Sequence, residues 1–352
     1  MCRPLTRRQF LSYGALALLL ASACGSPAAR TSTHSSSPRP TGNASVAVIT
    51  APPAPTRTSP PAPDTNDDPP SQLVSGASIG GCPLFPSDNP WRRDISSDPV
   101  DPRSASYVES ISEGGSFLHP DFGSSPEYGI PSEIVAESQR KVPITFTDYG
   151  DESDPGPYPI PLDARVEAGG DRHVLVVQRG ACKLYELFGA ERRGSGWAAA
   201  SGAVFDLRSN ALRPAGWTSA DAAGLPILPG LVRRDETTAG AIRHALRFTA
   251  PSTQRGYVDP ARHFASDSSS ADLPPMGLRL RLKRSFDISR YTGHSRVVLD
   301  ALRTYGMILA DNGSSWFISG ANDTGWNDTD LEQLKRVPGN AFEVVKHGTI
   351  HR

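Results

Sequence analysis

Residues 173–188, HVLVVQRGACKLYELF, carry the clearest indication of the fold. Two runs rich in Val, Leu, Tyr and Phe flank the turn-forming pair Arg179-Gly180. Side chains of this kind favour strands, and a short turn between two such runs is typical of a β-hairpin. The stretch therefore predicts a hairpin whose strands are residues 173–178 and 182–188.

Further strands and one helix are expected from periodicity. Residues 241–249 (AIRHALRFT) and 276–288 (MGLRLRLKRSFDI) alternate apolar and polar side chains, which is typical of strands. Residues 294–306 (HSRVVLDALRTYG) have a helical apolar stripe ending at a glycine. Residues 307–320 (MILADNGSSWFISG) read as a hairpin that turns at 311–313. The balance predicts a β-rich α+β fold, as a single large β-sandwich or distorted barrel with long loops and a few short helices near the C-terminus.

The N-terminal residues 6–24, TRRQFLSYGALALLLASAC, predict export. Their apolar run is shorter than the roughly 20 residues that cross a bilayer, so residues 1–23 fit a signal peptide. The pair Arg7-Arg8 resembles the twin-arginine export signal. Ala21-Ser22-Ala23-Cys24 resembles a lipoprotein cleavage box, in which Cys24 carries the lipid. We expect an extracytoplasmic, membrane-anchored lipoprotein; cleavage by ordinary signal peptidase, giving a secreted soluble protein, is the alternative.

Composition divides the rest of the chain. Residues 24–81 form a lipid-attached Pro/Ser/Thr-rich tether, residues 82–346 a globular β-rich domain, and residues 347–352 a tail. The chain has 36 basic and 37 acidic residues, which gives no electrostatic basis for binding nucleic acid. Cys82 and Cys182 remain after the signal and the lipid site. In an exported domain this pair predicts a disulfide, with two buried thiols as the alternative.

Three long blocks of the globular part carry a resemblance. They are ITFTDYGDESDPGPYPIP (144–161), SGAVFDLRSNALRPAGWTSADAAGLPILPGLVR (201–233) and YGMILADNGSSWFISG (305–320). These blocks resemble those of a group of exported bacterial proteins of unassigned function, over nearly all of residues 82–346. The resemblance implies export and a common fold, and it supplies no catalytic residue.

Carboxylates and one histidine are the candidate catalytic groups. Glycoside cleavage needs one carboxyl group that donates a proton and one that acts as nucleophile or base. We expect Glu186, Asp206, Asp221 and His263 to supply this chemistry. Glu186 stands in an apolar strand, where a carboxylate needs a partner. Asp206 and Asp221 can also be explained as caps of a turn and of a short helix.

Aromatic side chains in the same turn-rich segments suit a sugar ligand. Trp217 and Trp316 offer flat apolar faces and Asp311 can bond hydroxyl groups, although core packing and a place in a turn are simpler roles for them. Among the five histidines of residues 82–346 no pair has the i,i+2 or i,i+4 spacing of a local metal site, and the sequence has no phosphate-binding glycine motif. We therefore predict no local metal site there and identify no cofactor. Two hypotheses remain: an enzyme that cleaves a polysaccharide, and a non-catalytic lipoprotein that binds carbohydrate or the cell wall. The sequence leaves open whether the chain is an enzyme.

Overall fold

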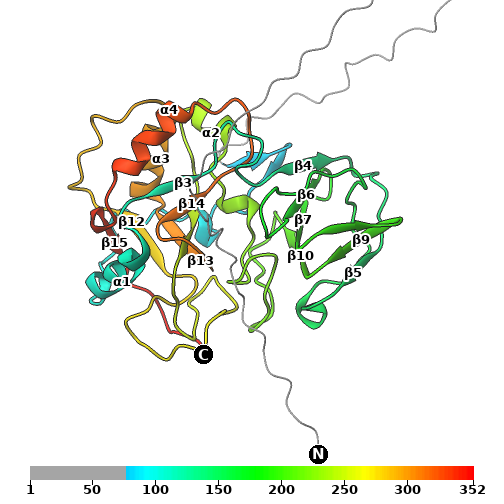
Figure 1. Cartoon of the computed structure of the whole chain (residues 1–352), viewed down its shortest axis with the longest axis horizontal. Helices are drawn as coiled ribbons and strands as arrows, with labels where there is room; N and C mark the ends of the chain where they lie inside the picture. The colour runs from blue at the N-terminus through cyan, green and yellow to red at the C-terminus, as the bar shows by residue number, and fades with distance from the viewer. Residues whose placement is uncertain (1–76) are drawn as a thin grey trace, which may run out of the picture. The chain divides into compact units, whose positions relative to one another are not determined.

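The structure is a computed structural model that describes residues 77–352 (Figure 1). The expected signal peptide, the lipid site Cys24 and most of the expected tether, residues 24–76, lie outside the described residues. The described part is rich in strands and has a few short helices, which confirms the predicted β-rich α+β class.

The strands are β1 (Ser78–Ile79), β2 (Cys82–Pro83), β3 (His119–Asp121), β4 (Ser132–Val135), β5 (Ile144–Phe146), β6 (Val174–Gln178), β7 (Lys183–Phe188), β8 (Glu191–Arg193), β9 (Gly196–Ala199), β10 (Ser201–Asp206), β11 (Leu246–Ala250), β12 (Arg279–Leu282), β13 (Met307–Asn312), β14 (Phe317–Ser319) and β15 (Phe342–Val344). The α-helices are α1 (Ser104–Ile111), α2 (Arg234–Thr238), α3 (Gly293–Thr304) and α4 (Asp328–Leu331). The 3-10 helices are η1 (Pro90–Arg92), η2 (Ser112–Gly114), η3 (Gly150–Glu152), η4 (Leu228–Gly230), η5 (Glu332–Arg336) and η6 (Gly339–Ala341).

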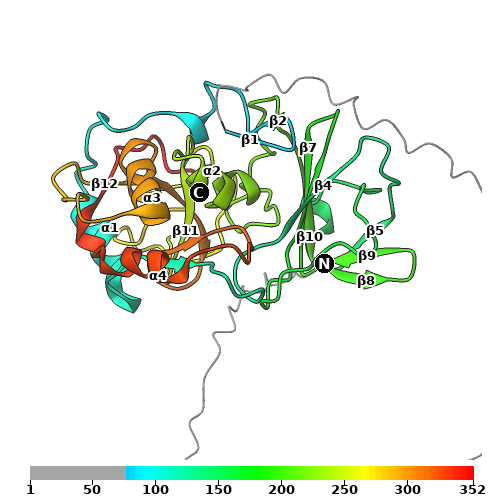
Figure 2. The same cartoon turned by 90° about the horizontal axis from the view of Figure 1, so that it is seen from above.

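The strands divide among separate sheets. A four-stranded sheet has the order β10-β7-β6-β4, a three-stranded sheet the order β5-β9-β8, and a six-stranded sheet the order β15-β12-β13-β11-β14-β3. Strands β1 and β2 pair with each other. The three-stranded sheet lies beside the four-stranded one, whereas α1, α3 and α4 accompany the six-stranded sheet (Figures 1 and 2). Within the described residues no sheet closes into a barrel.

The predicted hairpin at 173–188 is confirmed. Strands β6 and β7 pair antiparallel from Val174↔Leu187 to Gln178↔Lys183. Both faces of this pair are buried, because Val174 packs in a small core with the three-stranded sheet while its neighbour Leu175 packs in the larger core with the six-stranded sheet. A strand with apolar contacts on both faces has no polar face, which explains the unbroken run VLVV.

The predicted hairpin at 307–320 is wrong. Strands β13 and β14 do not pair with each other, because β11 lies between them, parallel to β13 and antiparallel to β14. The connecting chain passes the end of β11, where the Gly313 N–H donates to the Ala250 carbonyl at 2.9 Å. The turn residues do reverse the chain, but a local turn signal carries no information about a strand some 60 residues earlier that inserts into the gap.

The predicted helix at 294–306 is confirmed as α3, with a start one residue earlier. Gly306 follows it at φ 68°, and its N–H donates to the Ala301 carbonyl at 3.1 Å. A glycine in the left-handed region is a common end of a helix because it has no Cβ to clash. None of the helices described for residues 77–352 has both the length and the apolar character that crossing a bilayer requires.

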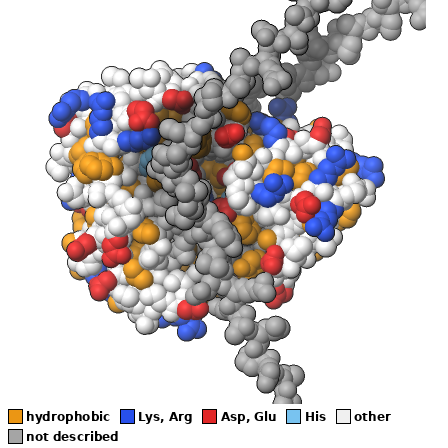
Figure 3. Space-filling view, viewed as in Figure 1, with side chains coloured by type: hydrophobic (Ala, Val, Ile, Leu, Met, Phe, Trp, Pro, Cys, Tyr) orange, Lys and Arg blue, Asp and Glu red, His pale blue; other side chains and the backbone are white. Residues whose placement is uncertain are grey.

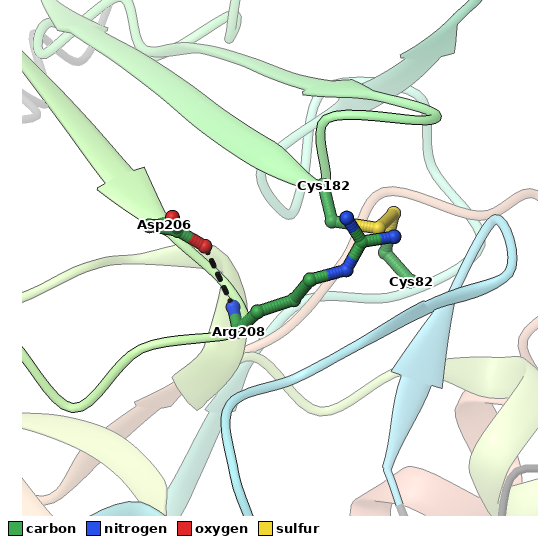
Figure 4. The surroundings of a disulfide bond; sticks show 4 residues. All are labelled: Cys82, Cys182, Asp206 and Arg208. Atoms are coloured by element: carbon green, nitrogen blue, oxygen red, sulfur yellow. Dashed lines mark hydrogen bonds between the residues drawn. A yellow bond between two sulfur atoms is a disulfide. The ribbon is translucent and has the colours of Figure 1, made fainter.

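The predicted disulfide between Cys82 and Cys182 is confirmed. It ties β2 to the turn that precedes β7, close to the end of β10 (Figure 4). On the face seen in Figure 3, acidic and basic side chains are interspersed, in keeping with a formal net charge of −1. Any excess of one charge is therefore confined to a small part of the molecule.

Candidate functional site

A buried loop, residues 218–233, connects the four-stranded and six-stranded sheets. Every residue in it is buried, although it contains no strand and only one 3-10 turn. It bonds to both sheets: Ser201 of β10 donates its hydroxyl to the Ser219 carbonyl at 2.7 Å, and the Ala223 N–H donates to the Ala310 carbonyl of β13 at 3.0 Å. Loops normally run on the surface because their backbone polar groups need partners. A buried loop therefore needs side chains that supply those partners.

Glu186 of β7 is one such partner. Its carboxylate accepts hydrogen bonds from the N–H groups of Ile227 at 3.0 Å and Leu228 at 2.9 Å. The side chain is completely buried. Burial raises the pKa of Glu186 to about 7, even though the two N–H donors act in the opposite direction, and the negative charge of Asp221 raises it further.

Arg247 of β11 links three elements through one buried guanidinium. Its Nε donates to Oδ2 of Asp221 at 3.2 Å and its Nη1 donates to the Ser319 hydroxyl of β14 at 2.6 Å. Its Nη2 lies 3.8 Å from Oδ2 of Asp311 on β13. Ser319 in turn pairs with Asp121 on β3. The guanidinium thus faces carboxylates from the buried loop and from the six-stranded sheet together.

Asp311 is the member of this group that combines a raised pKa with access to solvent. Its side chain is 24% exposed, whereas that of Asp221 is fully buried. Burial, with the charges of Asp221 and Asp171, raises the pKa of Asp311 to about 7. Burial raises the pKa of Asp221 as well, with Arg247 opposing. Because Asp221 is closer to the guanidinium, we assign the shared proton to Asp311.

A strand irregularity places Asp311 here. The pairing of β11 with β13 shifts between Phe248 and Thr249, so that Thr249 lies opposite Asp311 and Ala310 is passed over. Such a bulge re-aims the side chains that follow it, and bulges are frequent beside functional sites. The carbonyl of Ala310 is the group that accepts from Ala223 in the buried loop.

His173 supplies a second buried cation. Its Nδ1 lies 2.6 Å from Oε2 of Glu167 and its Nε2 lies 3.1 Å from the Ala220 carbonyl in the buried loop. Burial disfavours the charged imidazolium, but the Glu167 carboxylate outweighs this and raises the pKa of His173 to about 9. Since both ring nitrogens face acceptors, the doubly protonated ring satisfies both.

These groups form a connected set with more negative than positive side chains, which we call the acidic seam. Its carboxyl groups are Asp121, Glu167, Asp171, Glu186, Asp221 and Asp311, and its cations are His173 and Arg247. Asp121 and Asp171 are exposed and Asp311 is partly exposed, so the seam has an edge that reaches solvent. Burial raises the pKa of Asp121 too, and Glu167 and Asp171 add to this. Paired structural charges do not require such an excess, whereas acid–base sites depend on carboxyl groups whose pKa values are raised.

The candidate catalytic carboxylates separate into two groups. Glu186 and Asp221 belong to the seam, but both are fully buried. Because full burial keeps both side chains away from a polysaccharide, we interpret Glu186 as a residue that holds the loop and Asp221 as one that raises the pKa of Asp311. Asp206 lies outside the seam at the exposed end of β10, where its Oδ1 accepts from the Arg208 N–H at 2.9 Å (Figure 4). This is the turn-capping role that the sequence predicts as the alternative to catalysis for Asp206.

The other candidates also lie outside the seam. His263 has Nδ1 2.7 Å from the Ala222 carbonyl and Nε2 3.9 Å from a carboxylate oxygen of Glu152. Trp217 is half-buried, with the Arg213 guanidinium 5.6 Å from its ring centroid. Trp316 is corrected from ligand binding to core packing.

The correction for Trp316 follows from its surroundings. The ring is fully buried and stacks on Phe342, with centroids 5.3 Å apart, and on Phe248, with centroids 6.3 Å apart. Its Nε1 donates to the Ser112 hydroxyl at 3.1 Å. A ring enclosed on both sides has no face left for a sugar.

Sequence reasoning missed Arg247, His173, Glu167, Asp171 and Asp121 as members of the site. Arg247 had a usable signal, because it interrupts a strand between Leu246 and Phe248, where a buried charge needs partners. The carboxylates of the seam come from segments up to 190 residues apart, so no local spacing joins them.

In residues 77–352, no group of three or more His, Cys, Asp or Glu side chains is placed to hold a metal ion.

No protein-family model, no curated protein and no solved structure matches this chain. What the protein does can therefore be inferred only from its own residues.

Proposed function

We propose that this chain is an exported, lipid-anchored surface protein that cleaves a polysaccharide at the solvent-reaching edge of the acidic seam. One observation carries the proposal: the Asp311 side chain lies 3.8 Å from the buried Arg247 guanidinium and still reaches solvent, in surroundings where burial raises its pKa to about 7. A general acid works best when its pKa is near the working pH, because it is then protonated often enough to donate and acidic enough to do so. An ordinary exposed aspartate is ionised at neutral pH and cannot donate.

The seam offers a role for each group. Asp311 donates its proton to the oxygen of the glycosidic bond that breaks. Asp171 is exposed, and its negative charge acts on Asp311, so it serves as the nucleophile or as the base that activates water. Arg247 opposes the rise in the pKa of Asp221 behind them, and the negative charge of Asp221 raises the pKa of Asp311.

Release of new reducing ends from purified wall and plant glycans tests the proposal. Asp311→Asn removes the proton donor and is expected to lower the rate at least about 100-fold. Asp171→Asn is expected to do the same, because it removes the second carboxylate. Asp206→Asn is the matched control, since Asp206 is an exposed aspartate outside the seam. Activity in the Asp311 variant equal to that of the control overturns the assignment.

Binding without cleavage is the second candidate function. It is favoured by the full burial of Glu186 and Asp221, since enclosed carboxylates that bond a loop are also what a purely structural network contains. Retention of the protein on a glycan column, with no reducing ends released, would support this candidate and reject cleavage. Absence of both retention and release would reject both.

Export and lipid attachment can be tested separately. The Cys82–Cys182 disulfide suits an oxidising extracytoplasmic compartment, in agreement with the signal at residues 6–24. Cys24→Ala is expected to abolish incorporation of labelled fatty acid and to move the protein from the membrane fraction. An unchanged membrane fraction would contradict lipid anchoring at Cys24.

A further inference from the structure

A surface cavity of about 290 Å³ lies outside the acidic seam and shares no residue with it. Its lining residues are Phe286, Asp287, Arg290, Tyr291, Gln333 and Arg336. They come from the segment between β12 and α3 and from η5, which ends at Arg336. The volume is at the lower end of the range for small-molecule sites, which suits one sugar-sized ring.

The cavity is positively charged. Arg290 and Arg336 are both exposed, and neither forms an ion pair with another residue in the part of the chain that the structure describes. Asp287 is the one carboxylate among the lining residues that belong to the described range 77–352, and its Oδ1 already accepts from the Ser289 N–H at 2.8 Å. Two guanidinium groups against one carboxylate leave an excess positive charge that is free to pair with an anionic ligand.

The guanidinium groups of Arg290 and Arg336 both influence the Tyr291 hydroxyl. Burial raises the pKa of the Tyr291 hydroxyl, and the charges of Arg290 and Arg336 both oppose that rise. Both cations therefore lie close enough to the Tyr291 ring to favour a negative charge beside it. An anion in contact with this ring would be influenced by both.

The remaining lining gives the cavity a wall and a fixed polar group. The rings of Phe286 and Tyr291 have centroids 6.1 Å apart and are inclined at 46°, and both are half-buried. Gln333 is held from two sides, because its Oε1 accepts from the Thr292 N–H at 3.2 Å and its Nε2 donates to Oδ1 of Asp330 at 2.5 Å. A polar group whose orientation is already fixed costs less entropy when a ligand binds.

We propose that this cavity binds a uronic acid unit of an acidic polysaccharide, with the carboxylate between Arg290 and Arg336 and the ring against Phe286 and Tyr291. The choice of a polysaccharide rests on the proposed function. The negative charge and the ring of the ligand are inferred from the residues that line the cavity. A guanidinium binds a carboxylate through two parallel hydrogen bonds, and an aromatic ring packs against the apolar face of a pyranose.

Calorimetric titration of the full chain with trigalacturonic acid tests the inference. Its methyl ester keeps the rings and removes the charge, whereas polyglycerol phosphate keeps the charge and has no ring. We expect trigalacturonate to bind at least tenfold more tightly than either. We also expect Arg290→Gln and Arg336→Gln each to weaken binding about fivefold, as one exposed charge pair of up to about 1 kcal/mol would.

Arg192→Gln is the matched control, because Arg192 is exposed on β8, outside the cavity. It should leave the affinity unchanged. Equal affinity for the ester would overturn the role of the carboxylate, and equal affinity for polyglycerol phosphate would overturn that of the ring. Unchanged binding in the Arg290→Gln/Arg336→Gln double variant would overturn the location.

The binding and cleavage assays, made on the same protein, separate this inference from the proposed function. If a neutral glycan is cleaved but trigalacturonate does not bind, the cavity assignment fails and the seam assignment stands. If trigalacturonate binds through Arg290 and Arg336 but no glycan is cleaved, the proposed cleavage fails and the binding site stands.

Discussion

The acidic seam and the arginine-lined cavity each have an excess of one charge, but burial differs between them and so do the consequences of that charge. In the seam Glu186 and Asp221 are fully buried and Asp311 is largely buried, and burial raises the pKa values of all three. In the cavity Arg290 and Arg336 keep their contact with solvent and stay charged. The comparison indicates that burial turns an excess of charge into bound protons, whereas exposure leaves it available to a ligand. The two regions should therefore differ in how substitutions and pH affect stability.

Arg247→Met gives the largest expected effect. It removes the guanidinium that bonds Asp221 and Ser319 in the buried seam, and breaking a buried pair from one side costs about 3–5 kcal/mol. The free energy of unfolding should fall by that amount at pH 7, as measured by urea denaturation. The loss should be smaller at pH 5, because Asp221 can then take up a proton. A loss below about 1 kcal/mol would contradict the view that the seam depends on this cation.

Glu186→Gln tests the second largest effect, which depends on pH. The pKa of Glu186 rises from 4.5 to about 7 on folding, so its contribution to stability is complete below pH 4.5 and is lost as the pH rises through 7. Glutamine keeps an acceptor for the loop and cannot titrate. The wild type should therefore lose about 3 kcal/mol more than the variant between pH 4.5 and 8, at about 1.4 kcal/mol per pH unit.

Asp311 and His173 titrate in the same direction, so the measurement is the difference between wild type and variant at each pH. Glu113→Gln is the control, because Glu113 is exposed. Its difference from wild type should stay constant across the same pH range. A constant difference for Glu186→Gln as well would mean that folding does not raise the pKa of Glu186.

The sequence predicted the parts of the fold that depend on neighbouring residues. The hairpin at 173–188 and the helix α3 follow from periodicity and turn chemistry within one segment. The error at 307–320 arose because β11 enters the sheet between β13 and β14. Which strand fills such a gap depends on long-range packing, and the residues of the turn do not record it.

The site was predictable only in part, for the same reason. Glu186 stood out because a carboxylate in an apolar strand needs partners, and it has them in the N–H groups of Ile227 and Leu228. Burial itself was not predictable for Asp221 or Trp316, since both lie in segments rich in turn-forming residues. The bulge that aligns Asp311 with Thr249 depends on the pairing of two distant strands.

The smallest expected effect on stability comes from the cavity. Arg290→Gln and Arg336→Gln remove exposed charges that pair with no other described residue, so each should change the free energy of unfolding by less than about 0.5 kcal/mol. The change should not vary between pH 4.5 and 8, because arginine stays charged throughout. Urea denaturation at both pH values measures this. A loss above about 1.5 kcal/mol would show that the two arginines hold the cavity together, and their charge would then be part of the fold and not a surface kept for an anionic ligand.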